Sequence, residues 1–398
     1  MEKIEKIVRQ KLSSYRKDYR DKLDFNLKLL GSFIEKPITY DHVFDRFEDL
    51  DRILGKLVEI AVPIEEDQFL KELEPIEDAK SMLSRAYVAG LDTSYRRNPE
   101  KFIYPFLYVS TAYFVTGPAL EKPLTGIKSA FYFLDEVYDP SLTDIQIRLR
   151  MERYIKENEA KVVRLIVSQV KETPEKKIII FDEAFSPFFL SGAHRDLLKL
   201  HNQVLNEKFQ TLISNGFTPV AVYETLNHSF SKFLILNYYC KPKGKKCESC
   251  TGTYCEKYSV PDKFLIEVFI LKSGKKEFCR TCLLHFLSNL RRDYVSSEDM
   301  EIIGFYLSLR KGEIVRVEFP RAILKRRDAV EFIHKIIVTS SIQGAGYPYV
   351  LNKTHEMARK RADEMKRRIE LLISDVAERI YPYGVFTAKQ LAKRRRGV

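Results

Sequence analysis

One short stretch of the sequence sets the strongest limit on what the chain can fold into. Residues 178–182, with the sequence IIIFD, form an apolar run that ends in an acidic residue. A run this short and this apolar predicts a buried central strand with a carboxylate at its C-terminal end. A charge there costs free energy unless it is paired, lies at the end of the sheet or binds a cation. We therefore expect Asp182 at one end of a central sheet.

The segments on either side of this run predict a mixed α/β protein. Branched and aromatic residues mark strands, and apolar residues at helical spacing mark helices. The predicted strands are 86–92, 103–115, 127–137, 218–224, 301–309 and 314–318, and the predicted helices are 143–171, 192–214, 328–340 and 351–380. This order resembles a ribonuclease H-like core, a mixed sheet flanked by helices, with residues 86–238 and 296–382 as the core and residues 239–295 as an insertion.

The two ends of the chain differ from this core. Residues 1–85 carry apolar residues at helical spacing, such as Ile4, Ile7 and Leu12, and predict a helical extension that packs on the core or on a second subunit. Residues 383–398 form a basic tail. We expect this tail to bind DNA or a partner protein, or to be disordered.

Composition narrows the classes of function. With 398 residues, 45% hydrophobic and 31% charged, the chain can form two or three globular domains or one elaborated core. No apolar run reaches the roughly 18 residues of a membrane span, and the first residues, MEKIEKIVRQKL, are charged. We expect a soluble cytoplasmic protein without a membrane partner. A formal net charge of +12 favours a polyanionic partner such as DNA.

Two aspartates are expected to meet at one edge of the sheet. Asp92 ends the first predicted strand and Asp182 ends the buried one, so both can reach the same edge. The alternative for Asp92 is a turn-initiating aspartate in the sequence LDTS, because aspartate often starts turns. Asp182 has no such simple alternative, since it directly follows an apolar strand.

The helix before the buried strand can supply a third acid. From Ile178 to Asp182 the strand climbs about 13 Å, at about 3.3 Å per residue. An antiparallel helix covers the same distance in about nine residues of about 1.5 Å each. Counting back from a helix end near Val170 leads to Glu159, the nearest acid on the apolar face. Glu152 shares that face about 10 Å further along the helix axis and is the alternative.

Carboxylates that converge at a sheet end suit Mg²⁺ or Mn²⁺, which are hard cations that prefer oxygen ligands. Such an ion polarises a phosphodiester, lowers the pKa of a bound water and stabilises the attacking and leaving oxygens. The predicted reaction is therefore phosphodiester hydrolysis.

Three motifs in the chain resemble those of the NurA family of nucleases. LDTS at 91–94 looks like the family's VDGS, IIIFDEAF at 178–185 is similar to its LLDGSL element, and GYPYVLNKTHEMA at 346–358 resembles its closing GYPxxLxxAH motif. The resemblance extends over about residues 80–370. Thr93 and Glu183 stand where the family has glycine, and Glu183 could add or replace a ligand.

The resemblance implies a fold, an activity and partners. NurA proteins are archaeal and bacterial enzymes with a ribonuclease H-like fold, and they form dimers that work with the HerA hexameric helicase in trimming DNA ends. By resemblance Asp92, Glu159 and Asp182 would bind Mn²⁺, and Tyr347 and His355 would complete the site. The chain has no GxxxxGK[ST] phosphate-binding loop, so energy for translocation would come from a partner.

His355 lies in a helix whose apolar face predicts its direction. Leu351, His355, Ala358 and Ala362 share one face, so we expect the imidazole to point inward, towards the sheet edge that carries the acids. Such a histidine could position a water or a phosphate, or protonate the leaving oxygen. Tyr347 precedes the helix and could hydrogen-bond the scissile phosphate. Whether His355 also ligates metal stays open at this point.

All six cysteines lie between residues 240 and 282, a clustering that indicates metal in an intracellular protein. Two CxxC pairs are separated by a stretch with strand character, DKFLIEVFILKSGKKEF, and the second pair is predicted to start a helix. Since each pair directs two thiolates at one tetrahedral ion, we expect a structural zinc site in residues 239–295. Its predicted ligands are Cys247, Cys250, Cys279 and Cys282.

An iron–sulfur cluster is the alternative for this region. Cys240, Cys247, Cys250 and Cys255 have the spacing C-x6-C-x2-C-x4-C, similar to the cluster loop of endonuclease III-type glycosylases but one residue shorter. This choice leaves Cys279 and Cys282 without a role.

Basic side chains flank the predicted site in the sequence and could guide a DNA strand electrostatically. Arg96, Arg97 and Lys101 follow the first aspartate, and a second group lies at 321–327. The leading prediction is a metal-dependent DNA nuclease that acts in end resection. The alternative is a non-catalytic, zinc-containing nucleic-acid-binding subunit with a decayed nuclease centre, because neither aspartate motif keeps its glycine.

Overall fold

The computed structural model describes most of the chain. The described residues are 2–40, 59–64, 68–73, 81–97 without 82, 106–133, 143–170, 176–186, 195–243, 253–310 without 275, 276, 293 and 296, and 313–380. Among them, no helix is both long enough and apolar enough to cross a membrane.

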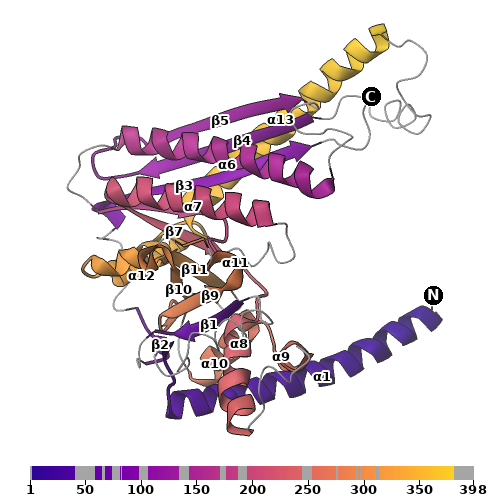
Figure 1. The fold of residues 1–398 in the computed structure, drawn as a ribbon, viewed down its shortest axis with the longest axis vertical. Coiled ribbons are helices and arrows are strands. Elements are labelled where there is room, and N and C mark those ends of the chain that lie inside the picture. Colours follow the sequence, from indigo (N-terminus) through magenta and orange to yellow (C-terminus); the bar gives the residue numbers. More distant parts are fainter. Residues whose placement is uncertain are drawn as a thin grey trace.

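A central mixed sheet forms the body of the molecule (Figure 1), which confirms the predicted mixed α/β class. The described strands join in the order β1-β9-β10-β11-β7-β6-β3-β4-β5, and β2 and β8 pair beside this path. The strands are β1 (Glu59–Pro63), β2 (Leu70–Lys71), β3 (Ala86–Arg97), β4 (Phe106–Thr116), β5 (Leu124–Phe133), β6 (Lys176–Phe181), β7 (Phe217–Tyr223), β8 (Arg280–Thr281), β9 (Leu284–Ser288), β10 (Ile302–Arg310) and β11 (Glu313–Pro320).

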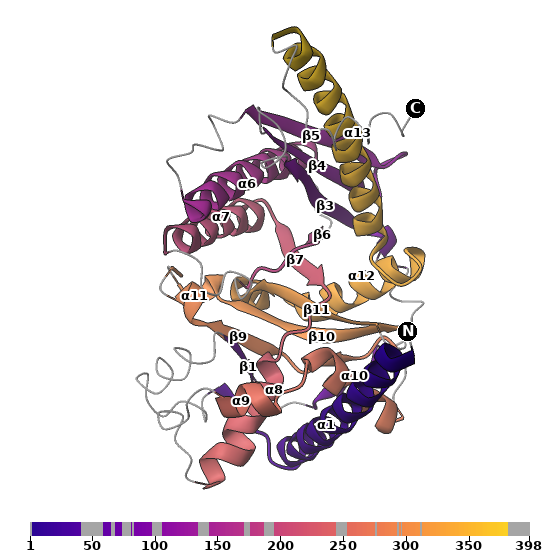
Figure 2. The same ribbon diagram turned by 90° about the vertical axis from the view of Figure 1, so that its right-hand side faces the viewer.

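Helices cover both faces of this sheet, with α6 and α7 on one side and α12 and α13 on the other (Figure 2). The remaining helices lie at the β1 and β9 end of the molecule or near it (Figure 1). The helices are α1 (Glu2–Glu35), α6 (Asp144–Gln169), α7 (Arg195–Ser214), α8 (Ser229–Ile235), α9 (Thr253–Tyr258), α10 (Asp262–Lys272), α11 (Asn289–Arg292), α12 (Ala329–Gln343) and α13 (Tyr349–Ile380).

The apolar run of β6 is the central strand that the sequence predicts. It pairs in parallel with β3 on one side and β7 on the other. Successive side chains of a strand point to opposite faces, so a strand covered by helices on both faces must be apolar throughout. Ile178 and Ile180 pack with the α12 and α13 side, while Ile179 and Phe181 pack with the α6 and α7 side.

The prediction of helix throughout residues 1–85 is correct for α1 and wrong for β1 and β2. All five residues of β1 are buried, and the strand pairs antiparallel with β9. Pairing with a distant strand decides the conformation of so short a segment, which helical spacing alone could not reveal. The predicted helical residues Val43 to Leu57 lie outside the described residues.

Two predictions within residues 239–295 are also wrong. The stretch predicted to have strand character begins with α10, where Leu265, Ile266 and Ile270 are buried. The second cysteine pair lies around β8 and before β9 rather than at the start of a helix. Short apolar runs do not distinguish a buried helix from a buried strand, and pairing of β8 and β9 with β10 in the central sheet decides the second case.

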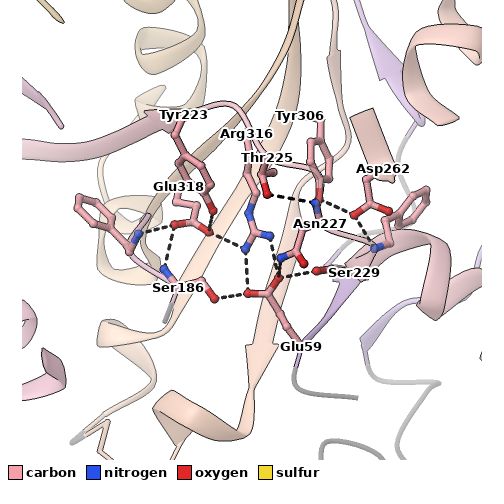
Figure 3. Close-up of polar contacts among 12 residues, drawn as sticks. Glu59, Ser186, Tyr223, Thr225, Asn227, Ser229, Asp262, Tyr306, Arg316 and Glu318 are labelled. Atoms are coloured by element: carbon pink, nitrogen blue, oxygen red, sulfur yellow. Dashed lines mark hydrogen bonds and ion pairs between the residues drawn. The ribbon is translucent and has the colours of Figure 1, made fainter. Parts of the chain in front are cut away.

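A fully buried arginine connects distant parts of the chain (Figure 3). Arg316 of β11 donates to both carboxylate oxygens of Glu59 in β1, at 2.7 and 3.0 Å. Its guanidinium also lies 2.6 Å from Glu318, which accepts hydrogen bonds from the backbone N–H groups of Phe185 and Ser186. These two residues directly follow the Asp182 turn, so the arginine ties β1, β11 and that turn together.

The buried charges around Arg316 depend on one another. Glu59 and Glu318 are 2% and 0% exposed, and removal of one partner from such a group leaves the others charged and uncompensated. Desolvation opposes ionisation of Glu59, but the Arg316 charge and the hydrogen bonds of Ser186 and Ser229 outweigh it and lower the pKa of this carboxyl.

We expect Arg316→Met to lower the free energy of unfolding by about 3–5 kcal/mol, the usual cost of breaking a buried ion pair. Urea denaturation measures the loss. Arg153→Ala is the matched control, because Arg153 pairs with Glu157 on the exposed side of α6 and its loss should change stability little. An Arg316→Met protein as stable as this control would show that the buried group does not hold the fold.

Candidate active site

The parallel pairing of β3 with β6 brings the two predicted aspartates together. Leu91 pairs with Phe181, so Asp92 and Asp182 follow paired positions of the two strands. The prediction that Asp92 ends its strand is wrong, because β3 continues to Arg97 in antiparallel pairing with β4, whereas Asp182 does follow the last residue of β6. Both carboxylates are partly buried. The convergence expected from the sequence is therefore present in the structure.

Tyr347 and His355 approach these aspartates from the α13 side of the sheet. His355 Nδ1 lies 2.9 Å from Asp92 Oδ2. The Tyr347 hydroxyl lies 2.9 Å from Asp182 Oδ1 and 2.9 Å from the carbonyl oxygen of Val222 in β7. Tyr347 therefore holds Asp182 in place, and its expected contact with a phosphate stays a prediction.

The direction of His355 differs in part from the prediction. Leu351, Ala358 and Ala362 are fully buried, but the His355 side chain is 55% exposed. The histidine thus lies at the rim of the buried stripe, where one edge of the ring meets Asp92 and the rest is open to solvent.

Asp92, Asp182 and His355 form a group suited to one metal ion. One ligand atom from each lies within 4.8 Å of the corresponding atoms of the other two. The two carboxylate oxygens suit a hard divalent ion such as Mn²⁺ or Mg²⁺, and the imidazole nitrogen is a donor that transition-metal ions accept. The donor set therefore fits the ion that the sequence predicts.

The ionisation of the two aspartates also fits a cation at this place. Burial raises the pKa of Asp92, and the nearby charge of Asp182 raises it further. Burial raises the pKa of Asp182 as well, against the hydrogen bond from Tyr347. Two neighbouring carboxylates with raised pKa values hold a proton more readily than ordinary carboxylates, and a cation between them would remove their repulsion.

Glu159 lies in the wall of the same pocket but is bound to lysines. The pocket has a volume of about 200 Å³ and is lined by Leu91, Asp92, Thr93, Tyr95, Glu152, Ile155, Lys156, Glu159, Phe181, Asp182 and Glu183. Glu159 is 5% exposed and lies 2.9 Å from Lys156 Nζ and 3.3 Å from Lys208 Nζ. The structure thus does not bring Glu159 into the group of Asp92, Asp182 and His355.

Glu183 is bound to the same two lysines, and Glu152 lies nearby. Lys156 Nζ is 2.6 Å from Glu183, and Lys208 also contacts this carboxylate. Burial opposes ionisation of Glu183, but the two lysines outweigh it and lower its pKa. Burial raises the pKa of Glu152. Sequence analysis did not identify Lys156 and Lys208 as residues of the site. For Lys156 a signal was present, because residues three positions apart on a helix are neighbours and Lys156 could be expected to pair with Glu159.

A glycine that the sequence analysis did not single out allows α13 to approach the site. A Cβ atom on Gly90 would lie 2.6 Å from the carbonyl oxygen of Val350 in α13. Glycine inside a strand often marks such a close approach of backbones. Gly90 and Asp92 lie on the same face of β3, so this contact places the first turns of α13, and with them His355, beside Asp92.

The predicted zinc ligands are described only in part. Cys247 and Cys250 lie outside the described residues. Cys279 and Cys282 are 0% and 1% exposed and belong to the same apolar cluster as Cys240 and Cys255. The zinc site and its iron–sulfur alternative therefore remain predictions.

Several of the predicted basic residues form internal contacts. Arg96 Nε lies 2.8 Å from Asp363 of α13, and Lys325 and Arg321 contact acidic residues at 299–301. Arg326 donates to carbonyl oxygens at the end of α7 and the start of β7. These side chains hold elements together, and Lys101 lies outside the described residues.

Fold and site together define a mixed α/β protein with a carboxylate and histidine group of the divalent-metal type. A family model described as the NurA domain matches residues 87–359, more than half of the chain. The protein therefore belongs to the NurA family, and this domain implies a nuclease-type function. No curated protein sequence matches the chain.

Three solved structures are similar to this chain. A crystal structure of NurA is 14% identical, with 77% of this chain and 90% of that chain covered and a TM-score of 0.37. A crystal structure of NurA with manganese is 12% identical, with 92% and 98% covered and a TM-score of 0.38. The catalytic domain of human endonuclease V is 9% identical, with 73% and 94% covered and a TM-score of 0.34.

We expect Gly90→Ala to lower the free energy of unfolding by about 1–3 kcal/mol, because the added methyl group must push α13 away from β3. Gly31→Ala is the control, since nothing lies within 4 Å of its Cβ position and alanine stabilises a helix. Urea denaturation of both variants should give changes of opposite sign. Equal stability of the Gly90→Ala and wild-type proteins would contradict the tight approach.

The raised pKa of Asp92 predicts how stability depends on pH in metal-free protein. A carboxyl whose pKa is higher in the folded state contributes more stability as pH falls through that pKa. Asp92→Asn should therefore unfold at a higher temperature than wild type at neutral pH, and this gain should shrink in mildly acidic buffer. Thermal unfolding in the presence of a chelator measures both.

Asp363→Asn is the control, because the pKa of Asp363 is lowered in the fold whereas that of Asp92 is raised. The hydrogen bond from Arg96 lowers the pKa of Asp363, so this carboxyl stabilises the fold above its unfolded pKa and loses that contribution as pH falls. The Asp363→Asn protein should show no gain at neutral pH. A gain for Asp92→Asn that persists unchanged in acid would refute the assignment.

Proposed function

We propose that this protein is a metal-dependent DNA nuclease that hydrolyses phosphodiester bonds during the processing of DNA ends. The observation that carries the proposal is the group of Asp92, Asp182 and His355, where β6 ends beside β3. Membership of the NurA family supports the nuclease class. The net charge of +12 supports a polyanionic substrate.

In this proposal Asp92 and Asp182, which line the pocket, would hold Mn²⁺ or Mg²⁺. A divalent ion bound there polarises the phosphodiester and lowers the pKa of a water. Tyr347 keeps Asp182 in place, and burial together with the Asp182 charge raises the pKa of this phenol, so that it stays a hydrogen-bond donor. His355 is open to substrate and serves as a third ligand or as the donor of a proton to the leaving oxygen.

The finer parts of the proposal follow the family resemblance. We propose on the resemblance alone that the protein forms a homodimer. We also propose that it works with a HerA-like hexameric ATPase, because its sequence carries no phosphate-binding loop of its own to supply energy for translocation. A lack of any effect of such an ATPase on DNA degradation would contradict the partnership. We also propose a structural Zn²⁺ in the cysteine region, and a visible absorbance of the purified protein would favour an iron–sulfur cluster instead.

The test of the proposal is Mn²⁺-dependent degradation of linear DNA. Asp92→Ala and Asp182→Ala should each lower the rate by at least about 100-fold, the scale of losing one preorganised electrostatic group. Glu157→Gln, on the exposed side of α6, is the control and should cleave like wild type. His355→Ala should lose Mn²⁺ affinity if the ring is a ligand, and lose only kcat if it transfers a proton.

The outcomes separate the two hypotheses. Equal cleavage by wild type and both aspartate variants would exclude the proposed centre. Binding of DNA without cleavage by any of these proteins would support the alternative, a nucleic-acid-binding subunit with a decayed nuclease centre. The replacement of the family's glycines by Thr93 and Glu183 is the observation behind that alternative.

A further inference from the structure

Two lysines and two glutamates form a compact charged cluster inside the pocket wall. Lys156 and Glu159 come from α6, Lys208 comes from α7, and Glu183 follows Asp182 at the end of β6. Lys156 Nζ lies 2.9 Å from Glu159 and 2.6 Å from Glu183. The Lys156 and Lys208 side chains are only 12% and 3% exposed, so the cluster is largely shielded from water.

The cluster borders the same pocket as the two aspartates. Glu152, Lys156, Glu159 and Glu183 line the pocket together with Asp92 and Asp182. Phosphodiesterases with two metal ions hold them about 3.5–4 Å apart, so that one ion serves the attacking oxygen and the other the leaving oxygen. The extra glutamates of this pocket are the residues that could hold a second ion.

Two of those glutamates, Glu159 and Glu183, are already neutralised by ammonium groups. Within the described part of the chain, Asp92, Asp182 and His355 are the one group with ligand atoms close enough for an ion. Glu159 and Glu183 each accept from both lysines. The charges of Lys156 and Lys208 balance those of Glu159 and Glu183. Of the glutamates that line the pocket only Glu152 is left over, and one carboxylate is a weak site for a second divalent cation.

We propose that the Lys156 ammonium takes the place of a second metal ion, so that the site holds one divalent cation and one fixed lysine charge. This inference rests on the proposed function and specifies how many divalent ions the site needs. Lys156 is chosen over Lys208 because it lines the pocket, whereas Lys208 lies behind it with its Nζ 4.6 Å from the centroid of the Phe181 ring. A lysine ammonium is a compact point charge that binds phosphate well.

This arrangement explains why Glu159 is absent from the metal-type group although it lies in the same pocket. Its role is to hold Lys156 in position together with Glu183. Glu183, which stands where the family motif has glycine, then serves the lysine and not the ion. Glu183, at the motif position, and Lys156 of α6 thus act together in the site.

The experiment counts Mn²⁺ ions per chain in the metal-stripped full-length protein, by electron paramagnetic resonance of the free ion during titration. Wild type should bind one Mn²⁺ at the pocket, and Asp92→Ala should lose it. Lys156→Ala removes the ammonium and leaves Glu152, Glu159 and Glu183 with an excess of negative charge, so this variant should bind a second Mn²⁺. Lys156→Arg keeps the charge and should bind one.

Thermal unfolding provides a second readout that does not depend on cleavage. Metal-free Lys156→Ala should unfold at a lower temperature than wild type, because Glu159 and Glu183 lose a partner. Added Mn²⁺ should raise its unfolding temperature more than that of wild type, since two ions bind the folded state instead of one. Arg153→Ala, which removes an exposed ion pair from the same helix, should behave like wild type in both measurements.

The results also distinguish this inference from the proposed function. Two ions in wild type, or a single ion in a folded Lys156→Ala protein, would overturn the inference and leave the nuclease proposal intact. No Mn²⁺ in wild type would overturn both. If Lys156→Ala is unfolded without metal, recovery of its folded state by Mn²⁺ supports the inference, and failure to recover contradicts it.

Discussion

The buried guanidinium of Arg316 is the constraint on which most of this structure depends. A charge with no exposure to water needs its partners in place, and those partners come from β1 and β11. Glu318 in turn accepts two backbone hydrogen bonds from the residues that follow the Asp182 turn. Glu59 lies before the residues matched by the family domain, at 87–359, so the core of the protein includes a segment outside that domain.

The central sheet divides the candidate site into two halves with different chemistry. On the α13 side, His355 contacts Asp92 of β3, and Tyr347 contacts Asp182 at the end of β6. On the α6 and α7 side, lysines neutralise the glutamates. The aspartates belong to both halves, because Asp182 directly follows β6 and Asp92 lies in the neighbouring parallel strand β3, between the two helical layers (Figure 2). Carboxylates are therefore available to a metal ion on the α13 side, whereas those on the α6 and α7 side are bound to ammonium groups.

Local patterns in the sequence predicted the parts of the fold that depend on few distant contacts. The run IIIFD predicted β6 with Asp182 after it, and helical spacing predicted α6, α7 and α13. The same patterns failed for β1, β8, β9 and α10, which are short and owe their conformation to pairing or burial against remote segments. The count along the helix led to Glu159, and the structure does place it at the pocket. Helical spacing carried no information about Lys208, which comes from another helix.

The sequence alone determined that Asp92 and Asp182 each follow an apolar strand segment, and that His355 and Tyr347 stand close together in the chain near a helix start. Only the tertiary structure decided how these residues meet. Parallel pairing of β3 with β6 aligns the aspartates, and the absence of a side chain at Gly90 lets α13 bring His355 to Asp92. Which carboxylates remain for a cation was likewise decided in three dimensions, because a lysine can neutralise a glutamate only where packing brings the two charges into contact.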